Sequence, residues 1–168
     1  MTDMQKDQVK LIKPDVALTD DAIQKTVLAL QTLLADEHVL YMKLRNYHWN
    51  VTGPNFITLH ELFEEQYTAL ADTIDDIAER IRSYGVRAIG TLKEMQEYAR
   101  LDETPGALPP ARDMVADLVS DHETLMRHLR AAANDMGEVG NMGEEDLFIG
   151  LLQDHQKKAW LLRAHLEG

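Results

Sequence analysis

The sequence lacks cysteine, and it lacks any long run of apolar residues. With no thiol among 168 residues, disulfides, thiolate zinc sites and cysteine nucleophiles are excluded, so any bound metal must be held by nitrogen and oxygen ligands. No stretch approaches the ~20 uncharged apolar residues that span a membrane. The opening segment, MTDMQKDQVKLIKPD, contains no apolar core of the kind found in signal peptides. We therefore expect a soluble, cytoplasmic protein that does not associate with membranes.

Positive charge is also scarce. Seventeen Lys and Arg stand against 29 Asp and Glu, and the formal net charge of −12 repels nucleic acid phosphates and attracts cations. The most basic stretch is at the start, where Lys6, Lys10 and Lys13 outnumber Asp3 and Asp7 by only one. These three lysines are the candidate DNA contacts, although an ordinary solvated tail explains them as well.

Apolar residues recur at helical spacing in four long segments, and no alternating strand pattern, repeat or low-complexity tract is present. The first three predicted helices span about 21–50, 56–84 and 110–135. Glycines at 137, 140 and 143 then separate the third helix from a fourth. The fourth carries Leu147, Phe148, Leu151, Leu152, Trp160, Leu161 and Leu166.

The connection between the second and third predicted helices is long. Residues 85–110 are rich in glycine and proline and leave room only for a short helix around 91–99. A long connection between two antiparallel helix pairs is typical of ferritin-like topology, whereas an up-and-down bundle does not need one. We therefore predict an all-α, ferritin-like four-helix bundle over residues 19–168, with a long crossover carrying a short helix. A flexible tail over residues 1–18 precedes it.

One face of the second predicted helix carries four side chains that can bind metal. On a helical wheel with His60 at zero, Glu64, Asp75 and Glu79 lie at roughly 40°, 60° and 100°. This polar stripe flanks the apolar stripe that predicts the bundle core. Glu64 and Asp75 are ~16 Å apart along the axis, far more than the ligands of one metal ion. A single copy of the helix therefore cannot close the site.

The four positions are symmetric along the helix. Positions 60 and 79, and likewise 64 and 75, are equidistant from a midpoint between 69 and 70. An antiparallel copy of the helix, crossing there on a two-fold axis, would place His60 opposite Glu79 of the copy and Glu64 opposite Asp75. The pattern predicts two identical metal sites at an interface between two chains.

His48 is predicted to join each site. His48 and His60 are equidistant from Pro54, so they should lie level across the antiparallel hairpin. Two imidazoles and three carboxylates suit Fe(II) and also accept Mn(II) or Zn(II). Carboxylates that can bridge two metals, in a site with open positions, suit oxidation of iron by an external oxidant. Each i,i+4 pair taken singly is more often a solvated surface pair, and only the combination favours a metal site.

Two other metal motifs do not match. Residues 60–64 read HELFE, so Glu64 stands where a helical zinc protease needs its second histidine. A di-iron centre inside the bundle needs a glutamate three residues before a histidine, and none of the seven histidines has one. The remaining histidines, which we expect to be surface or packing residues without a comparable cluster, are at positions 38, 122, 128, 155 and 165.

The run NYHWNVTGPNFITLHELFEEQYTALADTIDDIAERI closely resembles the signature of the Dps family, the mini-ferritins or DNA-binding proteins from starved cells. In that family the equivalents of His48, His60, Glu64, Asp75 and Glu79 form a ferroxidase centre at a subunit interface, and many relatives have aspartate at position 64. The resemblance implies a hollow homododecamer that oxidises Fe(II), preferably with hydrogen peroxide rather than oxygen. Deposition of ferric oxide inside it would protect against oxidative damage.

The resemblance also implies roles for residues outside the ligand set. Trp49 matches a family tryptophan that is implied to carry or quench oxidising equivalents, although packing at an interface explains it equally well. Family members admit iron through acidic pores near the start of the fourth helix. The candidates here are Glu144, Glu145 and Asp146, although acidic residues are favoured at any helix N-terminus.

Two rival functions stay open. A nucleoid-compacting protein would bind DNA through Lys6, Lys10 and Lys13 and would use its metal site mainly for assembly. The marginal charge of this tail and the acidity of the whole chain count against it. A structural helical oligomer with no metal is the other rival.

Overall fold

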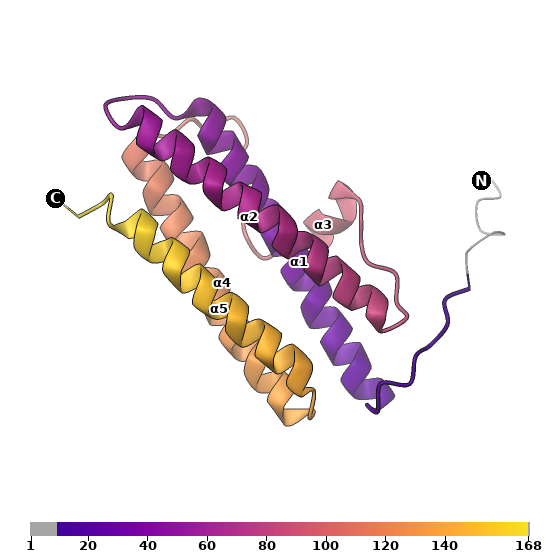
Figure 1. The fold of residues 1–168 in the computed structure, drawn as a ribbon. Helices are drawn as coiled ribbons and strands as arrows, with labels where there is room; N and C mark the ends of the chain where they lie inside the picture. The colour runs from indigo at the N-terminus through magenta and orange to yellow at the C-terminus, as the bar shows by residue number, and fades with distance from the viewer. Residues whose placement is uncertain (1–9, 168) are drawn as a thin grey trace, which may run out of the picture.

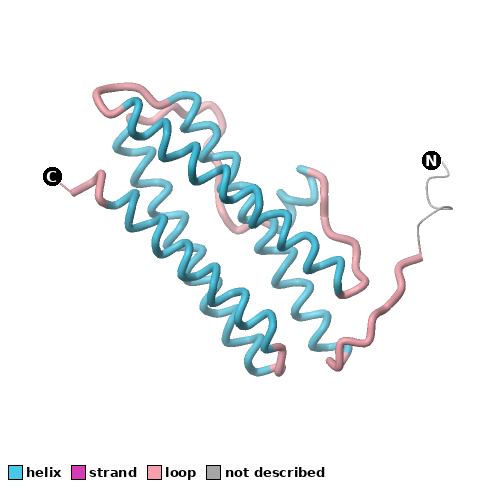
Figure 2. The backbone as a smooth tube through the Cα atoms, viewed as in Figure 1, coloured by secondary structure: helices cyan, strands magenta, loops and turns pink. Residues whose placement is uncertain are grey.

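The computed structural model describes residues 10–167, and over this range the chain is helical with no strands (Figure 2). The helices are α1 (Asp20–Asn50), α2 (Phe56–Ser83), α3 (Leu92–Tyr98), α4 (Ala111–Glu138) and α5 (Met142–Arg163). Four long helices form a bundle in which α1 pairs with α2 and α4 pairs with α5 (Figure 1). The short α3 lies in the crossover between the two pairs and packs against α1. The predicted ferritin-like bundle with a helix in its crossover is confirmed.

The capping residues explain where several helices begin and end. Thr19 caps α1 by accepting a hydrogen bond from the backbone N–H of Ala22. Thr91 starts α3 in a reciprocal capping box with Glu94. The third long helix ends later than predicted, because α4 continues through Gly137 to Glu138. Gly140, at φ +76°, terminates it instead, since glycine adopts positive φ without steric cost.

The apolar stripes predicted for the first two long helices form the centre of the bundle. The stripe on α2 is buried at five positions, with Phe63, Ile77 and Ile81 fully enclosed, and only Ile74 is half-buried. Each fully buried Leu, Ile or Phe stabilises the fold by about 1.5–3 kcal/mol. Within residues 10–167 no helix combines the length and the apolar character needed to cross a membrane.

The part of the predicted tail that the structure describes lies against the turn after α2. A Cβ atom on Gly85 would sit 2.6 Å from the carbonyl oxygen of Ile12 and 2.7 Å from Cδ of Pro14. Gly85 also has φ +73°, so both the contact and the backbone conformation require glycine. Residues 12–14 are therefore held beside the C-terminal end of α2.

Candidate metal centre

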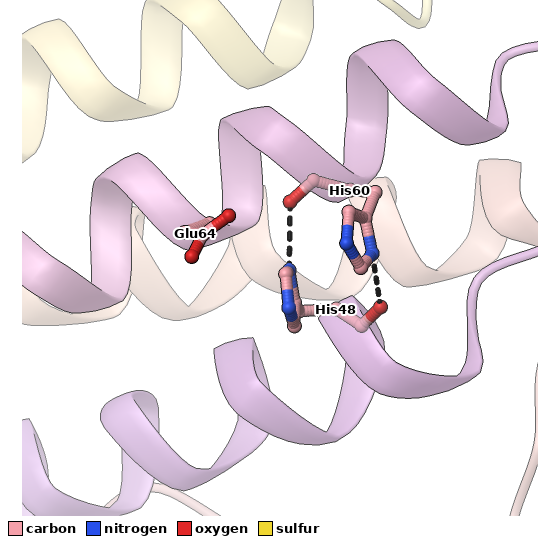
Figure 3. A group of neighbouring side chains, drawn as sticks. All are labelled: His48, His60 and Glu64. Carbon is pink, nitrogen blue, oxygen red and sulfur yellow. Dashed lines mark hydrogen bonds between the residues drawn. The ribbon is translucent and has the colours of Figure 1, made fainter.

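His48 of α1 and His60 of α2 face each other across the first hairpin (Figure 3). Their rings stack with centroids 3.7 Å apart. Nδ1 of His48 lies 2.8 Å from the carbonyl oxygen of His60, and Nδ1 of His60 lies 2.8 Å from the carbonyl oxygen of His48. A carbonyl oxygen can only accept, so both Nδ1 atoms carry protons. In the neutral form of each ring Nε2 then has the free lone pair, and this is the form in which imidazole binds a metal.

The end of α1 makes this reciprocal arrangement possible. His48 is in the last turn of α1, where carbonyl groups have no partner further along the helix. The carbonyl of Tyr47 is taken by the N–H of Val51, whereas the carbonyl of His48 accepts from the ring of His60. The predicted level placement of the two histidines is confirmed. The hydrogen bonds from Nδ1 fix the orientation of both rings.

Glu64, one helical turn after His60 on α2, forms a group of three potential metal ligands with His48 and His60. One ligand atom from each of His48, His60 and Glu64 can be chosen so that all three lie within 4.8 Å of one another. Two ligands of one ion, each about 2.1 Å from it, lie at most about 4.2 Å apart, which is close to the spacing found here. The hydroxyl of Tyr67 donates to Oε1 of Glu64 at 3.3 Å and restricts this exposed carboxylate.

Asp75 and Glu79 do not join this group within one chain. Both are exposed on the same helix, more than two turns beyond Glu64. Among residues 10–167, the only group of three or more potential ligands at metal spacing is the one formed by His48, His60 and Glu64. One chain thus brings together three of the five predicted ligands, and the contribution of Asp75 and Glu79 from a second copy stays a prediction.

An aromatic cluster beside the three ligands was not predicted. The guanidinium carbon of Arg45 lies 5.5, 5.1 and 5.3 Å from the ring centroids of Tyr41, Trp49 and Tyr67, the spacing of cation–π contacts. Tyr67 also meets the ring of His48 edge-on at 5.3 Å. The i,i+4 spacing of positions 41, 45 and 49 on α1 is the sequence signal for this cluster. Trp49 is 58% exposed in the single chain, and its role stays a prediction.

A second polar group joins α1 to α4, close in sequence to His48. Lys43 is ion-paired with Asp117 and Asp121, and the hydroxyl of Tyr47 donates to Asp117 at 2.7 Å. Burial raises the pKa of Asp121 to about 6, although its contact with Lys43 opposes this shift. These contacts support the end of α1 that carries His48, and they place no additional ligand in the metal group.

One of the three candidate pore residues is not exposed. Glu144 is 1% exposed and forms an ion pair with Arg80, whose Nη2 lies 2.7 Å from Oε2. The hydroxyl of Tyr84 donates to the other oxygen of Glu144. The prediction that Glu144 lines a pore is therefore wrong for the described chain, because α2 supplies a cation that neutralises this carboxylate. Glu145 is half-buried and Asp146 is exposed, so these two residues stay candidates.

The candidate DNA contacts are only partly within the described residues. Lys6 lies outside them. Lys10 is exposed, and Lys13 is exposed but ion-paired with Asp20 at the start of α1. The structure therefore brings no cluster of these lysines together within residues 10–167.

Two of the remaining histidines contact each other inside the bundle. His122 and His155 are buried, and their Nδ1 atoms lie 2.8 Å apart. As predicted, they join no group of metal ligands within residues 10–167. Their direct contact was not predicted, because α4 and α5 bring together positions 33 residues apart. His38, His128 and His165 are half-buried, in agreement with surface or packing roles.

Comparison with known proteins identifies the family. Residues 27–168 match the family model of the ferritin-like domain. The chain is 42% identical over 155 residues to a low temperature-induced protein of Nostoc sp., covering 92% of this chain and 87% of that protein. It is 39% identical over 144 residues to the DNA protection during starvation protein of Brevibacillus brevis, covering 86% of this chain and 96% of that protein.

A solved structure leads to the same family. The Dps protein of Vibrio cholerae O1, described as a member of a broad superfamily of ferritin-like diiron-carboxylate proteins, superposes with a TM-score of 0.86 at 31% identity. The superposition covers 96% of this chain and 99% of that one. The same helices and crossover are therefore shared along almost the whole length. The chain belongs to the ferritin-like family and, within it, to the Dps proteins.

Proposed function

We propose that the protein is a ferroxidase and iron-storage protein, which oxidises Fe(II) at sites between two chains and keeps the ferric oxide inside a hollow homododecamer. Hydrogen peroxide is the preferred oxidant, and oxygen is the alternative. The observation that carries this proposal is the His48–His60 pair, whose Nε2 lone pairs are both left free by the reciprocal backbone hydrogen bonds. Membership of the ferritin-like diiron-carboxylate proteins supports iron as the substrate.

Different side chains have different roles in the proposed oxidation. His48 and His60 bind Fe(II) through Nε2, and Glu64 supplies a carboxylate that can bridge a second ion. Hydrogen peroxide takes up two electrons, so two Fe(II) ions are oxidised for each peroxide, which with two protons becomes two waters. No hydroxyl radical is released when both electrons are delivered. Trp49, beside the centre, carries or quenches a stray oxidising equivalent.

The second copy of the chain supplies Asp75 and Glu79. Their exposure on α2, their distance from Glu64 and their symmetric spacing support this assignment. Assembly is supported by large apolar side chains left uncovered in the single chain, among them Leu28 at 57% and Trp160 at 60% exposure. Iron enters through acidic pores near the start of α5, where Glu145 and Asp146 are the remaining candidates. The same nitrogen and oxygen donors can hold Zn(II) or Mn(II), which would then compete with iron.

The test measures ferric absorbance after Fe(II) and peroxide are mixed, alongside native mass spectrometry of the same sample. Asp75→Ala is expected to slow oxidation sharply, whereas Asp76→Ala, which removes the adjacent exposed carboxylate, is the matched control and keeps the wild-type rate. Equal rates in the two variants would remove Asp75 from the site. A native mass other than twelve chains would contradict the shell but leave the site assignment intact.

A nucleoid-compacting role is the alternative, with Lys6, Lys10 and Lys13 on DNA and the metal serving mainly assembly. The name of the Brevibacillus brevis relative, DNA protection during starvation protein, favours it. The net charge of −12 per chain opposes it. A gel shift at low and moderate salt separates the two functions, because a cytoplasmic iron store without nucleoid association leaves DNA unshifted at both.

A further inference from the structure

The centre of the bundle contains a line of four hydrogen-bonded side chains, one from each long helix. Oε1 of Glu37 on α1 lies 2.8 Å from Nε2 of His155 on α5. Nδ1 of His155 lies 2.8 Å from Nδ1 of His122 on α4, and Nε2 of His122 lies 3.3 Å from Oε1 of Gln66 on α2. The four residues are at most 3% exposed. The proposed iron chemistry uses none of them.

The arrangement of this line does not suit a metal ion. Each imidazole uses one nitrogen for the other ring and its second nitrogen for a different partner, so the donor atoms follow one another instead of converging on a point. The group of His48, His60 and Glu64 is the only one at metal spacing in the described range. A line of hydrogen-bonded titratable groups is instead suited to taking up and releasing a proton.

Hydrogen bonding limits how many protons the line can hold. With Oε1 of Gln66 facing His122, as in the structure, His122 donates from Nε2 and accepts at Nδ1 from His155. A third proton lies between His155 and Glu37. The histidines and Glu37 together then hold three protons and have no net charge. Nε2 of Gln66 has no partner in this state.

A second bonding pattern holds one proton fewer. If the amide of Gln66 turns by half a rotation, its Nε2 donates to Nε2 of His122. His122 then donates from Nδ1 to His155, and His155 donates from Nε2 to the carboxylate of Glu37. All three hydrogen bonds persist, the net charge is −1, and His122 has changed its tautomer.

We propose that Glu37, His155, His122 and Gln66 form a buried site that binds and releases one proton per chain, with the Gln66 amide turning between the two states. Gln66 lines a hollow of about 220 Å³ between α2 and α5, together with Asp154, Lys157 and Lys158. The hollow gives protons access to this end of the line. The core can thus change its charge by one unit without losing a hydrogen bond between these side chains.

Burial and neighbouring charges together limit the site to one exchangeable proton. Charged side chains occur on each of the four helices beside the residues of the line: Asp36 and Lys43 on α1, Glu65 on α2, Asp121 on α4, and Asp154, Lys157 and Lys158 on α5. Asp36 is ion-paired with Arg100 and Asp121 with Lys43. Burial, and then the charges of His155 and Lys158, lower the pKa of His122 well below its usual value. A fourth proton would put an N–H group on both Nδ1 atoms, which face each other. The line therefore does not bind it.

The decisive measurement is nitrogen NMR of the full-length assembled protein labelled with 15N-histidine, titrated between about pH 5 and 10. The His122 signals are assigned by their loss in His122→Gln. The expected result is one transition, in which the proton on His122 moves from Nε2 at low pH to Nδ1 at high pH. A His122 ring that keeps one tautomer throughout, or that becomes doubly protonated, would overturn the proposal.

Two variants test the part played by the Gln66 amide. Gln66→Met keeps a similar volume but cannot donate a hydrogen bond, so His122 is expected to stay protonated on Nε2 at every pH. Gln156→Met, at an exposed position on α5 next to His155, is the matched control and should titrate as wild type does. A wild-type transition in Gln66→Met would exclude the amide as the switch. If that variant does not fold, as judged by circular dichroism, the wild-type titration still decides.

Discussion

The protein contains two histidine pairs that differ in what their second ring nitrogens contact. In the pair at the hairpin, each Nδ1 of His48 and His60 donates to a backbone carbonyl and each Nε2 is left free. In the pair at the centre of the bundle, every ring nitrogen of His122 and His155 already has a side-chain partner. The same residue type therefore suits a metal ion in one pair and, as proposed above, a proton in the other.

The surroundings of the two pairs follow the same division. His60 is half-buried and Glu64 is exposed, so an iron ion and an oxidant can reach the hairpin pair. His122 and His155 are at most 1% exposed, so only a species that travels along hydrogen bonds can reach the central pair. Accessibility and the partner of the second nitrogen together distinguish the functions that we propose for the two pairs.

The largest expected effect is on stability and belongs to the central pair. His155→Leu leaves the Glu37 carboxylate buried without its partner, and breaking a buried charged pair in this way costs about 3–5 kcal/mol. Urea unfolding at a fixed protein concentration measures this loss, since assembly also contributes to stability. His48→Leu, which removes a hydrogen bond to a backbone carbonyl and leaves no carboxylate buried without its partner, should lose much less. Equal losses in the two variants would contradict the distinction between the pairs.

The next effect is on activity and belongs to the hairpin pair. His48→Ala removes a ligand and is expected to slow peroxide-driven Fe(II) oxidation by at least about 10–100-fold, since loss even of a group that only orients a ligand has an effect of this size. Stopped-flow absorbance of the ferric product measures the rate. His122→Gln is the control, with its folding checked by circular dichroism, and it should keep nearly the wild-type rate. A slow His122→Gln would link the centre of the bundle to iron oxidation.

Acid should act on the central pair through His122. The pKa of His122 is lowered by burial in the folded chain, whereas the unfolded chain has an ordinary histidine near 6.5. Below that pH the unfolded chain binds the additional proton, so the folded state loses about 1.4 kcal/mol per pH unit through this residue. The difference in unfolding free energy between wild type and His122→Gln should therefore change as pH falls below about 6.5. A difference that is independent of pH would show that His122 is protonated in the folded chain.

The smallest expected effect concerns the orientation of Glu64. Tyr67→Phe removes the hydrogen bond to the carboxylate, worth about 0.5–1.5 kcal/mol, and should slow iron oxidation by about 2–10-fold. Tyr41→Phe is the control, because its hydroxyl contacts Arg45 and not Glu64. The same rate in both variants would mean that Tyr67 acts through packing alone.

Local patterns in the sequence predicted most of the fold. The apolar spacing of α1 and α2 and the cap at Thr19 depend on residues within a few positions of one another. The long crossover between the helix pairs and the short α3 inside it were predicted in the same way. The end of α4 was misplaced, because Gly137 continues the helix and Gly140 ends it. A glycine can occupy either position, and only the backbone conformation distinguishes the two.

The candidate site was predictable to the extent that it depends on one hairpin. The equal distances of His48 and His60 from Pro54 indicated their level placement, and the helical turn between His60 and Glu64 indicated the third ligand. The protons on both Nδ1 atoms could not be predicted, because they depend on carbonyl groups across the hairpin. Arg80, which neutralises Glu144, is 64 residues away in the chain, beyond any local pattern.

The sequence by itself determined the helices, the family and the positions of the five proposed ligands, because helical periodicity and short spacings are properties of neighbouring residues. Only the tertiary structure decided which histidine nitrogens stay free, which acids are neutralised, and that Glu37, Gln66, His122 and His155 meet in one line. Those outcomes depend on contacts between helices far apart in the chain, where packing, and not sequence distance, selects the partner of each polar group.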